Sequence, residues 1–176
     1  MHLRTRRDSI ILESMIRFSD GSVTLASHRN ASVTVIRDPI TMDQLRSLRR
    51  VVAELQKEHG TDRVSLAVVE PAAMAMPSDE VRAEATAIPR DLPTVLDATV
   101  LEGQGFRAAA VRAVMHGITL VTGRRSSRRT FATVEEAVES IVATGRVLLT
   151  RAQLLALVAE ARSGTAPHMS SAHDQP

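Results

Sequence analysis

The segment between residues 97 and 142 decides the fold of this chain. It begins with Asp97-Ala-Thr-Val-Leu101-Glu-Gly-Gln-Gly105, continues through Phe106-Arg-Ala-Ala-Ala-Val-Arg-Ala-Val-Met115, and ends with Arg128-Arg-Thr-Phe-Ala-Thr133-Val-Glu-Glu-Ala-Val-Glu-Ser-Ile141. Short apolar runs, a glycine turn and helical spacing predict a strand, a helix, a second short strand and a capped helix. Strands that alternate with helices are typical of an α/β sheet.

A β-hairpin and a long helix are predicted upstream of this segment. Residues 22–27 and 31–37 alternate apolar and polar side chains around His28-Arg29-Asn30, which predicts two paired strands with one buried face. That face would carry Val23, Leu25, Val33 and Val35. Thr41-Met-Asp-Gln44 is a capping box that opens a helix with an apolar stripe, and Gly60 is expected to end it. The opposite face of this helix carries Arg46, Arg49 and Arg50.

The remaining elements follow from similar patterns. Residues 63–69 form a nearly continuous apolar run, typical of a central strand covered on both faces. Ser78 is predicted to cap a helix over residues 79–88, which Pro89 is expected to end. Thr133-Val-Glu-Glu136 and Thr150-Arg-Ala-Gln153 are two further capping boxes.

We therefore predict a single mixed sheet of about five strands covered by about four helices, in the order β-β-α-β-α-β-α-β-α, plus an extra C-terminal helix. The α/β domain is expected to span residues 21–145. Residues 1–20 would form an arm that is frayed or carries a short helix, residues 146–163 the extra helix, and residues 164–176 a disordered tail.

Composition narrows the function classes. The pI of about 10.2 accompanies a formal net charge of only +2, because Lys57 is the sole lysine and the chain has no tyrosine or cysteine to titrate at high pH. The high pI therefore does not indicate nucleic-acid binding, and the three phenylalanines offer few stacking platforms for single strands. Without cysteines, a signal-peptide pattern or a long apolar run, we expect a cytoplasmic protein with no transmembrane segment.

Two stretches could bind an anion. Glu102-Gly-Gln-Gly-Phe106 lies between a strand and a helix, where it is either a tight turn or a backbone anion site. Four arginines, Arg124, Arg125, Arg128 and Arg129, form a candidate anion-binding loop or a solvated loop. Ser127 within this loop follows basic residues, as a basophilic kinase requires, and is a candidate phosphoacceptor.

No pattern in the chain predicts catalysis. The six histidines lack ligand spacing, no serine lies in a nucleophile elbow, and no phosphate loop is present. We expect no enzyme activity, no metal and no cofactor.

Three places in the sequence together resemble the STAS-like (SpoIIAA-like) family of bacterial regulatory domains, the branch compared with the CRAL-TRIO lipid-binding fold. The first is the hairpin followed by Asp38-Pro-Ile-Thr41 and a long helix. The second is Gly105-Phe-Arg-Ala-Ala-Ala-Val-Arg112 with Gly117-Ile-Thr-Leu-Val121, and the third is Arg129-Thr-Phe-Ala-Thr-Val-Glu-Glu-Ala137. The resemblance covers residues 22–142.

The resemblance implies a non-catalytic module that acts through protein–protein contacts. In anti-sigma-factor antagonists of this family, a serine at the start of the helix after the third strand is phosphorylated to switch partners. Ser78 is the serine at that place here, although the Asp-Ser-Ser-Gly type of sequence is absent. The candidate partner or ligand surface comprises Met74, Met76, Arg107 and Arg112.

Three alternatives remain open from the sequence. A small-ligand or lipid-binding domain would have an apolar pocket lined by Met74, Met76 and Leu92. An unrecognised enzyme would need titratable residues that converge in one cleft. A homo-oligomer would be built through the terminal helix, residues 150–162.

Overall fold

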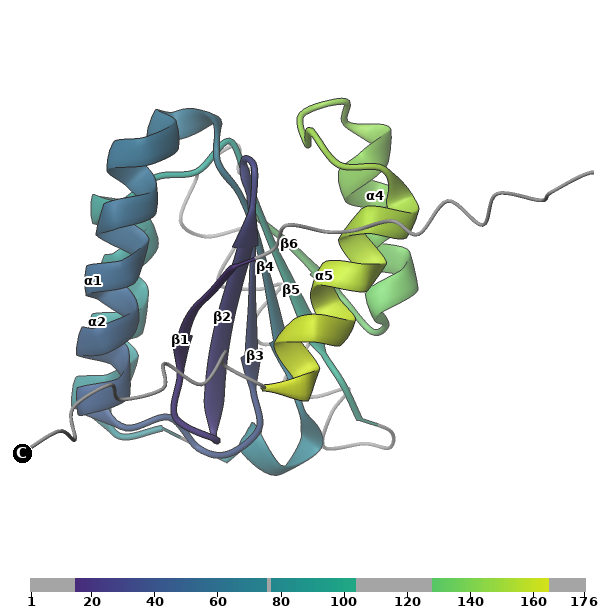
Figure 1. The fold of residues 1–176 in the computed structure, drawn as a ribbon. Coiled ribbons are helices and arrows are strands. Elements are labelled where there is room, and N and C mark those ends of the chain that lie inside the picture. The colour runs from purple at the N-terminus through teal and green to yellow at the C-terminus, as the bar shows by residue number, and fades with distance from the viewer. Residues whose placement is uncertain (1–14, 76, 104–127, 165–176) are drawn as a thin grey trace, which may run out of the picture.

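The computed structural model describes residues 15–75, 77–103 and 128–164. Within these residues a single mixed sheet has the strand order β1-β2-β3-β4-β5-β6 (Figure 1). The strands are β1 (Met15–Ser19), β2 (Val23–His28), β3 (Ala31–Ile36), β4 (Val64–Val69), β5 (Leu96–Leu101) and β6 (Arg128–Phe131). The helices are α1 (Met42–His59), α2 (Asp79–Asp91), α4 (Val134–Ala143) and α5 (Arg151–Ser163), with short 3-10 turns η1 (Gly60–Asp62) and η2 (Pro71–Ala73). Strands β1 to β3 pair antiparallel and β3 to β6 pair parallel, which confirms the predicted α/β class.

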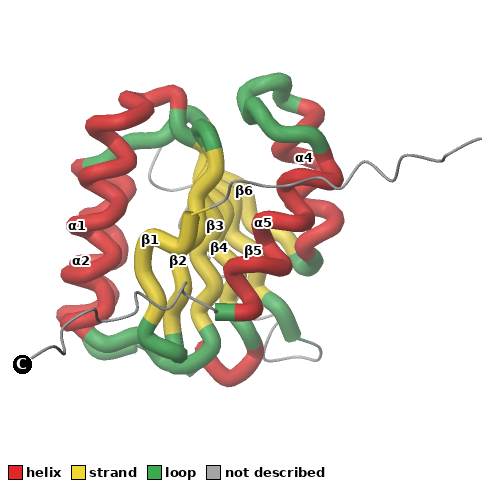
Figure 2. The backbone as a smooth tube through the Cα atoms, in the orientation of Figure 1, coloured by secondary structure: helices red, strands yellow, loops and turns green. Residues whose placement is uncertain are grey.

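Helices cover both faces of the sheet. Helices α1 and α2 lie on one face, and α4 and α5 lie on the other (Figures 1 and 2). The larger core lies between the sheet and the α4–α5 layer, and its fully buried side chains include Leu66, Ile141, Leu154 and Leu157. A smaller core between β2 and α1 contains Val23, Leu25, Leu48 and Leu55.

The β2–β3 hairpin forms where the sequence predicts it, but its buried side chains divide between two faces. Val23 and Leu25 face α1, whereas Val33 and Val35 belong to the core beneath α4 and α5. The predicted single buried face is therefore wrong. The register pairs Ala26 with Val33, so these two side chains lie on one face of the sheet and Leu25 lies on the other. Both faces are buried because helices cover the sheet on each side.

The sixth strand comes from the predicted N-terminal arm. Residues 15–19 form β1, an edge strand that pairs antiparallel with β2 and is irregular between Ile16 and Phe18. The Arg17 guanidinium spans from this strand to the end of α1, where it donates to Glu58 Oε2 at 2.8 Å and Oε1 at 3.2 Å. The frayed or helical arm predicted for these residues is thus corrected to a strand.

Helices α1 and α2 begin at the predicted caps. The capping box of Thr41 and Gln44 is present, and Ser78 caps α2. Helix α2 does not end at Ile88, as predicted, but continues through Pro89 to Asp91. Proline has no amide hydrogen, so the carbonyl four residues before it loses its helical hydrogen bond. That carbonyl belongs to Ala85, which is exposed, so water can supply the missing hydrogen bond.

Helices α4 and α5 also begin at predicted threonines. Thr133 caps α4 through the Glu136 amide, but the Glu136 carboxylate accepts from the Ala132 amide (3.4 Å), so the predicted capping box is only half formed. The Thr150 box is complete. The buried face of α5 packs on β2 and β3, so this helix is part of the domain core.

Candidate functional site

The parallel strands β3 to β6 give the sheet two different edges. Helices α1, α2 and α4 begin at the edge where these strands end, which we call the carboxyl edge, at the lower end of Figure 1. The β2–β3 turn and the α4–α5 loop lie at the opposite, amino edge. Open α/β sheets commonly bind ligands at the carboxyl edge, in the crevice where the strand order reverses. The described sheet has a sequential order, so it contains no such reversal.

The structure places the Met74 and Ser78 region at the carboxyl edge. The Glu70 amide donates to the Ile36 carbonyl (2.9 Å), which keeps the chain in the sheet until η2 turns it away. Met74 is half-buried after this turn, and Ser78 is exposed. The Ser78 hydroxyl accepts from the Val81 amide (3.4 Å) and caps α2, as the sequence predicts.

Met74 and Leu92 lie at opposite ends of α2. Met74 precedes α2 and Leu92 follows it. The 13 residues of α2 span about 20 Å at a rise of about 1.5 Å per residue. Met76 lies outside the described residues, so the apolar pocket expected from Met74, Met76 and Leu92 stays a prediction.

Two arginines hold the end of α5 at the carboxyl edge. Arg37 Nη2 donates to the carbonyls of Ala161 (2.9 Å) and Arg162 (2.7 Å), and its Nη1 donates to Thr24 Oγ1 (3.0 Å). The carbonyls of a last helical turn lack helical partners, so a cation stabilises them. Arg162 forms an ion pair with Glu102, which directly follows β5. Both guanidinium groups are thus engaged within the chain.

The predicted arginine loop is only partly described. Arg128 and Arg129 do not belong to a loop, because they begin β6. Arg128 Nε donates to Asp97 Oδ2 on β5 (3.0 Å), and Arg129 Nη1 donates to Ser140 Oγ on α4 (2.8 Å). The short strand predicted from Arg128 onward is therefore confirmed, whereas the description of these two residues as part of a loop is wrong. The other candidates, Arg107, Arg112, Arg124, Arg125 and Ser127, lie outside the described residues.

The strand before the Gly-rich stretch ends as predicted. Gly103 has φ 145°, a conformation that favours glycine, and this agrees with a tight turn after β5. Residues 104–106 of the same stretch lie outside the described part of the chain, so its role as an anion site stays a prediction.

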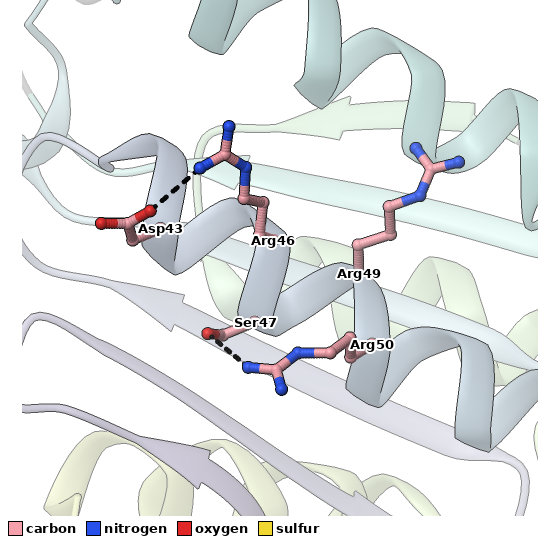
Figure 3. A pocket seen from close by; sticks show the side chains of 5 residues that line it. All are labelled: Asp43, Arg46, Ser47, Arg49 and Arg50. Carbon is pink, nitrogen blue, oxygen red and sulfur yellow. Dashed lines mark hydrogen bonds and ion pairs between the residues drawn. The ribbon is translucent and has the colours of Figure 1, made fainter.

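A hollow on the outer side of α1 is lined by Asp43, Arg46, Ser47, Arg49 and Arg50 (Figure 3). Arg46 pairs with Asp43 (3.2 Å), and Arg50 donates to Ser47 Oγ (3.2 Å). Figure 3 shows the Arg46 and Arg50 guanidinium groups on opposite sides of the helix, so they do not converge on one anion. We therefore do not assign an anion site to this hollow.

Arg49 joins α1 to α2. Its guanidinium donates to Glu84 Oε1 (3.0 Å) and Asp91 Oδ2 (2.7 Å), which lie on the neighbouring helix. The sequence predicts only that Arg49 faces away from the core of α1, because the helical pattern of one segment does not reveal its neighbour. Hydrogen bonds from Arg90 and from Arg49 lower the pKa of the Asp91 carboxyl.

Replacing Arg49 by methionine is expected to raise the pKa of Asp91. A carboxyl whose pKa is lowered in the folded state stabilises the fold above its unfolded pKa of about 3.9, and this stabilisation is lost as the pH falls through the folded value. An NMR titration of the Asp91 carboxyl carbon measures the pKa directly. Arg46→Met is the matched control, because Arg46 pairs with Asp43 instead. An unchanged Asp91 pKa in Arg49→Met would contradict the assignment.

Comparison with known protein families found none that matches this chain, and a search of curated proteins found no relative. In residues 15–75, 77–103 and 128–164, no three His, Asp or Glu side chains gather as metal ligands would. No helix in the same residues is both long enough and apolar enough to span a bilayer.

Proposed function

We propose that this protein is a non-catalytic regulatory domain that binds a partner protein at the carboxyl edge of its sheet. The observation that carries this proposal is the position of Ser78. Its side chain is exposed, and it caps the helix that follows β4, the third of the strands predicted from the sequence. In the STAS-like antagonists that the sequence resembles, the switch serine begins the helix after the third strand, and Ser78 corresponds to it when the strands are counted from β2.

The form of the sheet supports binding through a surface. The sequential strand order contains no reversal in the described residues, so a buried small-molecule crevice of the usual α/β kind is not expected there. The carboxyl edge instead offers Ser78 beside half-buried Met74 and the exposed residues Ala72 and Ala75. Loops at strand ends commonly carry the contacts of such folds, and methionine adapts to different partners.

Phosphorylation of Ser78 would change the charge of this surface without requiring a new fold. A phosphate at an N-cap accepts hydrogen bonds from the first amides of a helix, whose dipole favours an anion. Arg82, now paired with Asp79, lies one turn further along α2 and could also pair with the phosphate. Asp79 and Glu80 already make the helix start acidic, so the modified surface would repel acidic partners and favour basic ones.

The test compares Ser78→Asp with Ser78→Asn. Both residues are good N-caps, so the two variants keep the start of α2 and differ mainly in one negative charge. Immobilised wild type, Ser78→Asp and Ser78→Asn are incubated with native lysate, and the captured proteins are quantified by mass spectrometry. We expect one protein whose captured amount differs by about tenfold between the two variants, because like-charge contacts at an interface cost several kcal/mol.

The wild type is expected to behave like Ser78→Asn, since neither carries the charge. Equal capture of every protein by all three forms would refute the switch at Ser78. Capture of no protein by any form would refute the proposed role in protein binding.

A further inference from the structure

The large hydrophobic side chains that are exposed in the described residues both lie at the amino edge. Met15 is 54% exposed at the start of β1, and Leu148 is 61% exposed in the loop between α4 and α5. Figure 1 shows this loop at the upper end of the molecule, level with the β2–β3 turn. A single exposed leucine is common on protein surfaces, so its meaning depends on how it is held.

The backbone of Leu148 is fixed on both sides of its side chain. Its amide donates to Asn30 Oδ1 (2.9 Å), and its carbonyl accepts from Arg29 Nη1 (2.9 Å). Both neighbours, Val147 and Leu149, are buried in the core. The exposed Leu148 side chain, which we call the knob, therefore projects from a fixed backbone. Binding a partner through it would cost little conformational entropy.

Arginines surround this knob. Arg29 and Arg146 are exposed, and neither forms an ion pair with a carboxylate in the residues that the structure describes. Arg151 pairs with Glu139 at 3.6 Å. The exposed carboxylate of Asp62 also lies near this edge, because the Asp62 and Arg146 carbonyls accept from the same Asn30 amide, and it forms no ion pair in the described residues. Within these residues, the rim around Leu148 thus carries two unpaired arginines and one unpaired carboxylate, and its net charge is positive.

The carboxyl edge of the same molecule has the complementary character. Exposed Pro71, Ala72 and Ala75 form a small apolar surface after β4. Acidic side chains lie around it because strand ends and helix starts meet at this edge, and helix starts favour acids. Asp38, Glu70 and Glu80 are three of the acids at this edge that form no ion pair in the described residues; Asp20, Glu135 and Glu136 are others.

We infer that a second copy of this chain binds head to tail, with Leu148 of one copy against the Pro71–Ala72–Ala75 surface of the next. Arg29 and Arg146 would then face Asp38, Glu70 and Glu80 of the neighbouring copy. The unpaired acids in the described part of the carboxyl edge complement Arg29 and Arg146, and this charge complementarity favours a second copy as the occupant. Such a contact joins two different surfaces, so it repeats and builds rings or open chains. The inference does not rest on the proposed regulatory function, but both place a partner on Ala72 and Ala75, so a second copy would compete there with the regulatory partner.

The assembly is tested by sedimentation velocity of the full chain at roughly 10 µM to 1 mM, the range in which small interfaces associate. We expect the sedimentation coefficient of the wild type to rise with concentration and to fall toward the monomer value in high salt, which screens exposed charges. Arg146→Ala/Leu148→Ala alters the amino edge, and Glu70→Gln/Glu80→Gln alters the carboxyl edge. Each double variant alone should remain monomeric over this range.

A mixture of the two double variants gives the sharpest result. Each supplies the edge that the other lacks, so the mixture should form one intact contact and stop at the heterodimer. The substitutions neutralise charges and do not reverse them, so the mixture gains no new ion pair. Recovery in the mixture also shows that both variants are folded.

Three results would overturn the inference. The first is a wild type that stays monomeric at every concentration, and the second is a double variant that assembles as the wild type does. The third is a monomer that co-sediments with phosphatidylserine–phosphatidylcholine vesicles through Leu148, which would assign the knob to a membrane surface instead.

Discussion

Replacing Leu157 by alanine is expected to lower the free energy of unfolding by about 3–5 kcal/mol. Leu157 is fully buried on α5, where it belongs to the core shared with β3, β4 and α4. The substitution removes apolar burial and leaves a cavity that the packed surroundings only partly fill. Because domains of this size are stable by only about 5–15 kcal/mol, the variant should unfold at markedly lower urea concentration.

Leu148→Ala is the matched control for this measurement. It removes the same atoms from a side chain that is 61% exposed, so we expect a loss below about 1 kcal/mol. Urea unfolding followed by far-UV circular dichroism at low protein concentration gives both values. Equal losses for the two variants would show that α5 does not pack on the sheet as described.

The position of α5 also bears on the homo-oligomer predicted through residues 150–162. The apolar side chains of this helix are buried within the chain, and the helix packs against β2 and β3. Deletion of residues 149–176 would therefore remove part of the core, and a change in assembly after such a deletion would not identify an interface.

Replacing Asn30 by alanine is expected to cost about 2–4 kcal/mol of stability, although the side chain is small and polar. Asn30 is only 6% exposed, and its amide group joins three segments at the amino edge. Its Nδ2 donates to the carbonyls of Asp62 and Arg146, and its Oδ1 accepts from the Leu148 amide, each at 2.9 Å. Alanine would leave these backbone groups without their partner, in a place where water enters poorly.

Asn30→Asp separates the donor from the acceptor role. The carboxylate keeps an acceptor for the Leu148 amide but faces the carbonyls of Asp62 and Arg146 without a hydrogen to donate. Its folded-state pKa should be raised, because protonation restores one donor. A raised pKa means that Asn30→Asp should recover stability, relative to the wild type, as the pH falls through the raised folded pKa. Thermal unfolding at pH 7 and pH 5 tests this, and Asn30→Ala should show no such recovery.

Local patterns in the sequence determined which segments become helices and parallel strands. Thr41, Ser78 and Thr150 cap their helices as predicted, because an N-cap bonds to an amide only two or three residues away. The apolar run of residues 64–69 forms the strand between β3 and β5. An apolar run of this length is typical of a strand whose side chains are buried on both faces of the sheet. Helix α2 passed through Pro89 because the lost bond falls at an exposed carbonyl.

The tertiary structure alone decided every feature that joins distant segments. Strand β1 exists because β2 offers a free edge, and Arg17 reaches Glu58 at the far end of α1. The predicted apolar side chains of β2 and β3 face opposite cores, because the pairing register decides which face of the sheet each side chain takes. Composition does not specify that register. In the candidate sites, the sequence determined that Ser78 starts a helix. Two of the three side-chain contacts of Asn30, to Arg146 and Leu148, join residues more than 100 positions apart. Such contacts have no local pattern from which to predict them.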